Sequence, residues 1–452
     1  MKLRPELLAA LLLAGCATYH PLPLDTRARA PGNPADIKVN AASMPLPALR
    51  HHVFDPSNGL DMTEVAMLAV ANNPQLKLAR DDLGIAHAQA FAAGLLPDPV
   101  LGVARDFPIA GPATSTAFNV GLSYDVSALL THATAKKAAQ ATARQVDLNL
   151  LWLEWQVVSA ARQLFIRHDY EQKTLTLLRQ EEKLLAQRHD RMVAAYRHGD
   201  VTLDAVSADL ASLQAVQTRV NDVERQLVAT GQALNGLLGL SPRATLDLVG
   251  PAAIPTVSDA VVRRDLAELP RRRPDLLALE AGYQSQEARY RQAILQQFPA
   301  INVGFVRARD TGGVNTRGFQ IALTLPIFNR NRGNIAIEKA TRLRLHDEYS
   351  ARLMSARADI EHILQDQALL QRQRGEIEQG IALTAQTLAG ADAALARGDL
   401  SETDYVLLKS AWLNRRLDLL GVEQTLLEQQ AALQTLLGGA LPARTPHAGA
   451  NS

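Results

Sequence analysis

The sequence predicts a mainly α-helical, internally duplicated chain with a small membrane-inserted β part. Three observations lead to this fold class. The chain of 452 residues repeats itself about 200 residues apart. Each half contains a segment of about ten residues in which apolar side chains alternate strictly. Between Leu129 and Arg197 there is neither proline nor glycine, so a helix can continue far beyond the length found in a compact domain.

The duplication is visible in matching residues at a nearly constant offset. Asn73-Pro74 matches Arg273-Pro274 at an offset of 200 residues. Gly199-Asp200 matches Gly398-Asp399, and Leu237-Leu238-Gly239 matches Leu436-Leu437-Gly438, both at an offset of 199. An alternating apolar run matches at an offset of 201: Phe118, Val120, Leu122, Tyr124 and Val126 with Phe319, Ile321, Leu323, Leu325 and Ile327. So small a drift indicates a tandem duplication.

We expect six segments along the chain. They are a signal peptide at 1–15, a lipidated proline-rich strap at 16–59, a first repeat at 60–240, a linker at 241–265, a second repeat at 266–439 and a loose tail at 440–452. Within the repeats we place β-hairpins at 98–127 and 299–328, followed by long helical hairpins at 129–240 and 334–439.

The overall composition excludes several classes of protein. The 47 basic and 46 acidic residues leave a net charge of +1, so no general basic face is available for nucleic acid. The Arg271-Arg272-Arg273 run is interpreted as a solvated start of a helix. A mean hydropathy of −0.06 excludes a helical integral membrane protein. If this chain crosses a membrane, it therefore uses strands.

The N-terminus has the pattern of a secretory signal. Lys2 and Arg4 precede an apolar stretch, Leu7 to Leu13, and small residues lead to the sole cysteine, Cys16. The sequence Leu-Ala-Gly-Cys at 13–16 resembles the bacterial lipobox, which implies cleavage before Cys16 and a covalent lipid such as palmitate on it. Ala17 favours the outer membrane by the same resemblance. The alternative is a chance cysteine in a buried helix.

The two alternating segments are predicted to be strands with one lipid-facing side. Their partner strands are expected at 100–107 and 301–309. About ten residues is also the length of a tilted transmembrane strand. Seven of the 20 aromatic residues fall in or beside these hairpins, as at a membrane interface. The alternative is hairpins packed on a soluble core. The expected lipid-facing residues are Phe118, Val120, Leu122, Tyr124, Phe319, Ile321, Leu323 and Leu325.

Four strands cannot close a barrel around a channel, and an open sheet edge is not tolerated in lipid. Several chains would therefore share one barrel. Three copies would supply twelve strands, which is enough for an aqueous lumen. The fold class is thus completed as a trimeric 12-stranded β-barrel to which each chain contributes four strands.

The helices beyond the strands are predicted to pair as coiled coils. The stretch 129–197 could extend about 100 Å as one helix. The next, 201–238, carries apolar residues three and four apart, and the second half repeats part of this seam. Helices this long cannot form one compact core, so we expect a hollow α-helical barrel. Gly199 and Gly398 would end the first helix of each hairpin, with Asp200 and Asp399 capping the next.

Taken together, these features resemble the TolC family of outer-membrane efflux factors, and most closely the lipidated outer-membrane components of tripartite resistance-nodulation-division (RND) pumps. Three local sequences carry the resemblance: Arg-Arg-Pro-Asp-Leu at 272–276, Asn-Asn-Pro-Gln-Leu at 72–76 and Leu-Thr-Leu-Pro-Ile-Phe at 323–328. The resemblance implies a homotrimer in the bacterial outer membrane with a long periplasmic helical tunnel. It also implies a periplasmic adaptor (membrane-fusion) protein and an inner-membrane pump as partners.

The same resemblance implies a periplasmic gate at the helical tips. Asp404 matches one gate carboxylate, beside the tip residues Gly199, Asp200, Gly398 and Asp399. Leu407 stands where a second gate aspartate is usual, and Leu400 occupies a place that is often polar. Asp125 replaces the proline that its repeat-mate Pro326 supplies.

These observations favour a passive exit duct that conducts drugs or heavy-metal cations, with both cargoes open. The chain has no phosphate-binding loop, zinc-protease motif or nucleophile elbow, so we expect no enzyme activity. The eleven histidines, His51-His52 included, lack metal-ligand spacing, and no metal or cofactor is expected besides the lipid on Cys16. The alternatives are an outer-membrane duct for type I protein secretion and a non-conducting coiled-coil envelope lipoprotein.

Overall fold

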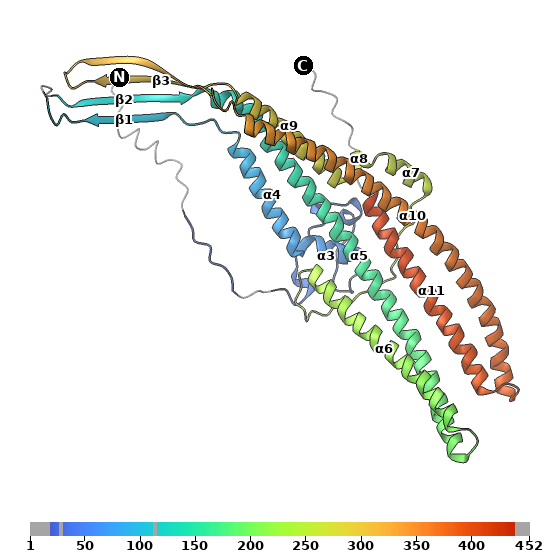
Figure 1. Ribbon diagram of the computed structural model, residues 1–452. Helices are drawn as coiled ribbons and strands as arrows, with labels where there is room; N and C mark the ends of the chain where they lie inside the picture. The colour runs from blue at the N-terminus through green and yellow to red at the C-terminus, as the bar shows by residue number, and fades with distance from the viewer. Residues whose placement is uncertain (1–18, 27–29, 112–114, 439–452) are drawn as a thin grey trace.

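The chain is an elongated bundle of long helices that carries a four-stranded sheet at one end (Figure 1). The computed structural model describes residues 19–26, 30–111 and 115–438. The signal peptide, Cys16 and the tail from 440 lie outside the described residues. Among the described helices, none is long and apolar enough to cross a membrane.

The two halves of the chain repeat the same order of elements, with one exception. The first half has α3 (Met62–Asn72), α4 (Pro74–Ala92), β1 (Val100–Asp106), β2 (Ala117–Asp125), α5 (Val126–His198) and α6 (Leu203–Leu237). The second half has α7 (Asp259–Ala267), α8 (Leu269–Arg272), α9 (Pro274–Leu295), β3 (Ala300–Arg309), β4 (Asn315–Thr324), α10 (Arg332–Arg397) and α11 (Glu402–Leu436). Two short helices, α7 and α8, thus take the place of α3 in the second half. The bounds of α6 and α11 differ by 199 residues at both ends, which is the repeat offset seen in the sequence.

Helix α5 is the longest element and begins directly where the sheet ends. Its 73 residues extend about 110 Å at the usual rise per residue. Asp125 caps it, because its carboxylate accepts hydrogen bonds from the backbone N–H groups of Ser127 (2.9 Å) and Ala128 (3.2 Å). The predicted strand to Ser127 is therefore too long by two residues. The second half differs here, since a loop containing Pro326 separates β4 from α10.

The helices pack as two hairpins against each other. Helix α5 contacts α6, α9 and α11, and α10 contacts α9 and α11. The predicted seam of α6 supplies Leu213, Val216, Val220 and Val223, which are buried against α5 and α11. Leu210 of the same seam is exposed.

The main core lies where α3 crosses α5. Val65 to Val70 of α3 are buried there with Trp155 and Phe165 of α5. The proline-rich segment before α3 lies over this core through η1 (Pro34–Asp36), η2 (Ala41–Ser43) and α2 (Pro47–Arg50). Met44, Leu46 and Leu49 from this segment join the same cluster, so the strap is held by apolar burial.

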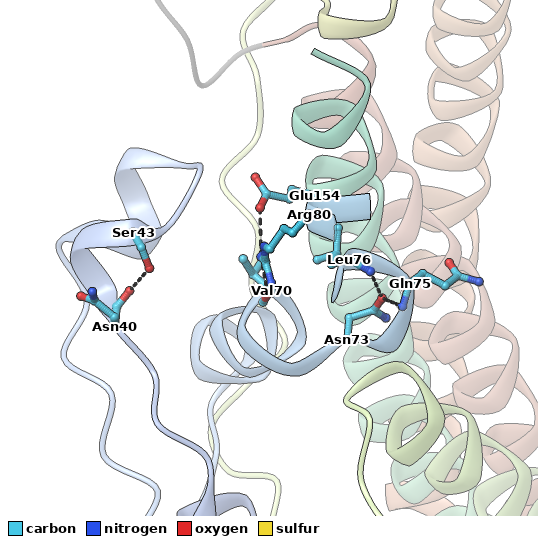
Figure 2. Close-up of polar contacts among 8 residues, drawn as sticks. All are labelled: Asn40, Ser43, Val70, Asn73, Gln75, Leu76, Arg80 and Glu154. Carbon is cyan, nitrogen blue, oxygen red and sulfur yellow. Dashed lines mark hydrogen bonds and ion pairs between the residues drawn. The ribbon is translucent and has the colours of Figure 1, made fainter. Parts of the chain in front are cut away.

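The Asn-Asn-Pro sequence is a joint between α3, α4 and the end of α6. The Asn73 side chain caps α4 by accepting from the backbone N–H groups of Gln75 (2.9 Å) and Leu76 (3.0 Å), as Figure 2 shows. Its amide donates to the carbonyl of Leu237 (2.8 Å). Arg80, one turn further along α4, bridges Val70 O (2.8 Å) and the carboxylate of Glu154 (3.0 Å). Gly239 closes the joint at φ 63°, where a Cβ atom would lie 2.5 Å from Asn72 O.

The repeat-mate of that joint contains the Arg-Arg-Pro-Asp sequence, and its arginines are buried. Arg272 and Arg273 are 7% and 3% exposed, so the predicted solvated helix start is wrong for both. Arg273 donates two hydrogen bonds to Asp275, at 2.9 and 2.8 Å, and its guanidinium lies 4.8 Å from the Trp152 ring centroid. Only Arg271 is exposed.

Candidate functional site

The sheet has two chemically different faces, which its register fixes. All three strand pairs are antiparallel in the order β1-β2-β3-β4. Directly opposed residues project from the same face, so Val103, Val120, Arg307 and Arg317 form one row across the sheet. The next row towards the helices is Leu101, Leu122, Phe305 and Phe319.

We call this side the apolar face. It consists of Leu101, Val103, Phe118, Val120, Leu122, Tyr124, Ile301, Val303, Phe305, Phe319, Ile321 and Leu323, with arginines at the end near the hairpin turns. Nine of its apolar residues are more than a third exposed, a pattern that monomeric soluble proteins rarely show over a contiguous surface. The face therefore requires an apolar environment or another chain.

The opposite side, which we call the small-residue face, is polar and hollow. It carries mainly glycine, alanine, serine, asparagine and glutamine, among them Gly121, Ser123, Asn302, Gln320 and Ala322, together with Val100 and Val306. A groove of about 500 Å³ runs along it. A sheet with one apolar and one small polar face suits a wall between lipid and water.

Seven of the eight residues predicted to face lipid lie together on the apolar face. The eighth, Leu325, is 62% exposed but follows the last residue of β4, so the predicted second strand is too long. The prediction named no residue of β1 or β3 in this surface. Leu101, Val103, Val303 and Phe305 join it through the register, although alternation in those two segments is visible in the sequence.

The far ends of the helical hairpins form the second candidate site (Figure 1). Gly199 and Gly398 end α5 and α10 in the left-handed conformation, at φ 83° and 78°. The caps of the following helices are Thr202 and Ser401, whose hydroxyl oxygens accept from Ala205 N and Asp404 N. The predicted caps Asp200 and Asp399 are wrong. Asp399 instead pairs with Arg397 at 2.8 Å.

Asp404 belongs to the cap of α11. Its carboxylate accepts a hydrogen bond from the Ser401 hydroxyl (2.6 Å). The backbone N–H of Asp404 donates to the oxygen of that hydroxyl, Ser401 Oγ (3.1 Å). Both partners are exposed. The acid three residues after a serine cap is recognisable in a sequence, so this role was accessible from the Ser-Glu-Thr-Asp pattern.

A buried ion-pair cluster stabilises the first hairpin near its tip, and a more exposed ion pair links it to the second hairpin. Asp209 is 1% exposed at its side chain and pairs with Arg188 and, at 3.2 Å, with His189 Nδ1. Arg191 of α5 forms an ion pair with Glu402 of α11, which links one hairpin to the other. Sequence analysis predicts none of these ion pairs, because charged residues on a helix are usually interpreted as its solvated face.

A polar network lies further from the tips, between α5, α6 and α11. Glu181 accepts from the Asn414 amide (3.1 Å) and lies 3.6 Å from Arg219. Burial raises the pKa of Glu181, and Arg219 and Asn414 oppose this shift. Arg219 also donates to Asn414 Oδ1 (3.0 Å), which closes a three-residue network.

One group has the geometry of a metal site but is accounted for by a helix cap. His52, Asp61 and Glu64 bring ligand atoms within 4.8 Å of one another. Asp61 and Glu64 form a capping box at α3, and Glu64 also accepts from Asp55 N (2.7 Å). Asp61 Oδ2 faces His52 Nε2 at 3.3 Å. Each carboxylate oxygen therefore already faces a donor of the chain.

The second half of the chain matches a known family. Residues 266–439 match the model described as outer membrane efflux protein. No curated protein matches the chain in sequence.

Solved structures of outer-membrane channels share the fold. CusC, in a study of folding and transmembrane channel formation, is 17% identical with a TM-score of 0.68, covering 87% of this chain and 97% of its own. VceC from Vibrio cholerae is 17% identical with a TM-score of 0.70, covering 83% and 96%. CmeC from Campylobacter jejuni is 15% identical with a TM-score of 0.70, covering 95% and 96%. The predicted mainly helical fold with a small four-stranded sheet is confirmed, as is its resemblance to the fold of TolC-like channels.

Proposed function

Because this chain contains an outer membrane efflux protein domain, we propose that it forms the outer-membrane exit duct of a tripartite efflux pump. The observation that carries the proposal is the two-faced sheet at one end of long helical hairpins. Its apolar face would contact lipid and its small-residue face would line water, and the hairpins continue the passage into the periplasm.

The duct requires more than one chain. Strands β1 and β4 are the edges of the sheet, and their unpaired backbone groups cannot lie in lipid. Three copies would pair β4 of one with β1 of the next and close a 12-stranded barrel. We propose this homotrimer as the functional unit in the bacterial outer membrane.

Transport through the duct would be passive. We propose that an inner-membrane pump supplies the energy, and that a periplasmic adaptor meets the helical tips around Gly199 and Gly398. The small, mostly uncharged side chains of the small-residue face suit a lumen that does not select its cargo. Drugs and heavy-metal cations are therefore both proposed cargoes, with selection made by the pump.

Planar bilayers test the proposal directly. The purified full-length trimer, with its tips opened by the adaptor, is expected to give stepwise ion conductance. A non-conducting envelope lipoprotein would give none, so absence of conductance from intact trimers would overturn the duct. Passage of a folded or unfolded polypeptide instead of small solutes would favour type I secretion.

Asp404→Ala is expected to increase leakage through the closed tip. The substitution removes a carboxylate from the narrow end and weakens the α11 cap, at a cost of about 1 kcal/mol. Conductance of the trimer without adaptor measures the effect. Asp359→Ala is the matched control, since Asp359 is an exposed acid of α10 about ten helical turns before the tip, and the conductance of this variant should equal that of wild type. Equal conductance of Asp404→Ala and wild type would leave Asp404 with only a structural role.

We also propose that Cys16 carries the lipid anchor. Cys16→Ser is expected to abolish incorporation of radiolabelled palmitate, because the chain has no other cysteine to acylate. Radioactivity of the immunoprecipitated protein measures the labelling. The variant should also keep its signal peptide uncleaved. Labelling that survives the substitution would refute the lipobox assignment.

A further inference from the structure

Four arginines gather at one end of the apolar face, beside the hairpin turns. The outermost row across the sheet is Arg105, Phe118, Arg309 and Asn315, and the next row contains Arg307 and Arg317. Three strands therefore contribute cations to one side of the sheet. We call Arg105, Arg307, Arg309 and Arg317 the arginine patch; all four are exposed.

Within the described part of the chain, no carboxylate pairs with the patch. Asp106 lies opposite Ala117 and projects from the small-residue face. Asp310 lies in the turn after β3, where its carboxylate accepts from Val314 N (2.9 Å). The Arg105 guanidinium lies 5.1 Å from the centroid of the Phe107 ring.

The arrangement disfavours the isolated sheet. Arg307 and Arg317 are directly opposed on neighbouring strands, so their Cβ atoms lie roughly 5 Å apart. Arg309 follows two residues along β3, about 7 Å further. Like charges in direct opposition destabilise a sheet. An anion bound between them would remove this cost.

The position of the patch indicates which anion. Its two rows border an uncharged band that begins with Leu101, Leu122, Phe305 and Phe319 and continues to the helices. The helices leave the opposite end of the sheet (Figure 1). If the helices are periplasmic, as the proposed function requires, the patch lies at the outer surface of the membrane, on the lipid side of the wall.

We propose that the arginine patch binds the phosphorylated headgroups of outer-leaflet lipid. Guanidinium groups bind phosphate through two parallel hydrogen bonds, and arginine is suited to this geometry. The acyl chains of the same lipid would lie against the apolar band below. In the proposed trimer, Arg317 of one copy and Arg105 of the next stand on neighbouring strands, so the patch becomes a continuous belt. This inference rests on the proposed function for the orientation of the sheet.

Binding of labelled lipid A to the purified full-length trimer in neutral detergent tests the proposal. Fluorescence anisotropy compares diphosphoryl lipid A with its dephosphorylated form. We expect the quadruple variant R105Q/R307Q/R309Q/R317Q to lose affinity for the diphosphoryl form by roughly fivefold per arginine removed, because each basic side chain near an anionic surface contributes about that factor. The dephosphorylated form should bind weakly to both proteins.

The matched control removes four exposed arginines elsewhere. R263Q/R352Q/R357Q/R372Q changes the net charge equally, and none of these side chains pairs with another described residue. Its affinity should equal that of wild type. The double variant R307Q/R317Q is tested in parallel in case the quadruple variant does not assemble. Since it removes an opposed like-charge pair, its melting temperature in neutral detergent should not fall.

Three outcomes would overturn the inference: unchanged affinity in the patch variants, equal binding of the dephosphorylated lipid, or full displacement by inorganic phosphate at the lipid's own concentration. The last would identify a general anion site. Conductance separates this test from the proposed function, since the patch faces away from the lumen. A wild-type trimer that conducts but binds lipid A no better than the variants refutes only the lipid site.

Discussion

Ile321→Lys is expected to prevent assembly of the protein in the outer membrane. Ile321 is 56% exposed in the middle of the apolar face, in the row of Tyr124 and Val303. A lysine on the lipid-facing side of a barrel costs about 2–4 kcal/mol near the membrane midplane. Three copies would incur this cost together. The amount of heat-resistant trimer in the outer-membrane fraction measures the effect.

Ala322→Lys is the control for this substitution. Ala322 is the next residue on the same strand, is also exposed, and projects from the small-residue face opposite Asn302. Its lysine would extend into water, so near wild-type assembly is expected. If the two variants assembled equally well, or failed equally, the assignment of the faces to lipid and water would be wrong.

Arg273→Ala is expected to be the most destabilising single change outside the sheet. It leaves the buried Asp275 carboxylate without its two hydrogen bonds and removes the contact with Trp152. Removing one partner of a buried ion pair costs about 3–5 kcal/mol. Thermal unfolding followed by circular dichroism should show a clear fall in melting temperature.

Arg271→Ala is the matched control, because Arg271 is exposed and its loss should change stability by no more than about 0.5 kcal/mol. The double variant Arg273→Ala with Asp275→Ala should recover part of the stability, since no unpaired charge remains. Equal melting temperatures for the Arg271 and Arg273 variants would show that the buried pair does not stabilise the fold.

The order and the bounds of the long elements were predictable because the duplication supplies them twice. A residue pattern that is ambiguous in one half, such as the strand before Phe118, can be compared with its mate before Phe319. The seam of α6 was also predictable, since apolar residues at spacings of three and four in a long helix indicate a coiled-coil contact. Where the halves differ, the comparison was misleading: Asp125 ends its strand by capping α5, whereas Pro326 lies in a loop.

The burial of Arg272 and Arg273 could not be predicted from their local sequence. Three successive arginines before a proline have the composition of a solvated turn. Asp275 is a local partner of Arg273, but other partners of these arginines lie further away in the sequence. Asp265 precedes Arg272 by seven residues, and Trp152 comes from the other half of the chain. Contacts over such separations are set by helix packing, which hydrophobic periodicity does not encode.

The candidate sites also contain some features that the sequence predicts and others that it does not. Strict alternation in β2 and β4 predicted which residues share a face, because the side-chain period of a strand is two. The arginine patch required the register, since residues 105, 307 and 317 are brought together only by strand pairing. At the tips, the glycines predicted the turns, but Thr202 and Ser401 compete successfully with Asp200 and Asp399 for the capping position.

The two hairpins are not equally stiff. Helix α5 runs from the sheet to its tip without glycine or proline, so it contains none of the residues at which helices usually kink. Its counterpart α10 contains Gly375, Gly380 and Gly390 in the half nearest its tip, and none of them has a neighbour that a Cβ atom would touch. Glycine lowers the cost of local unwinding. Bending of the helices near their tips is therefore expected first in α10, while α5 should keep its own tip in fixed relation to the sheet.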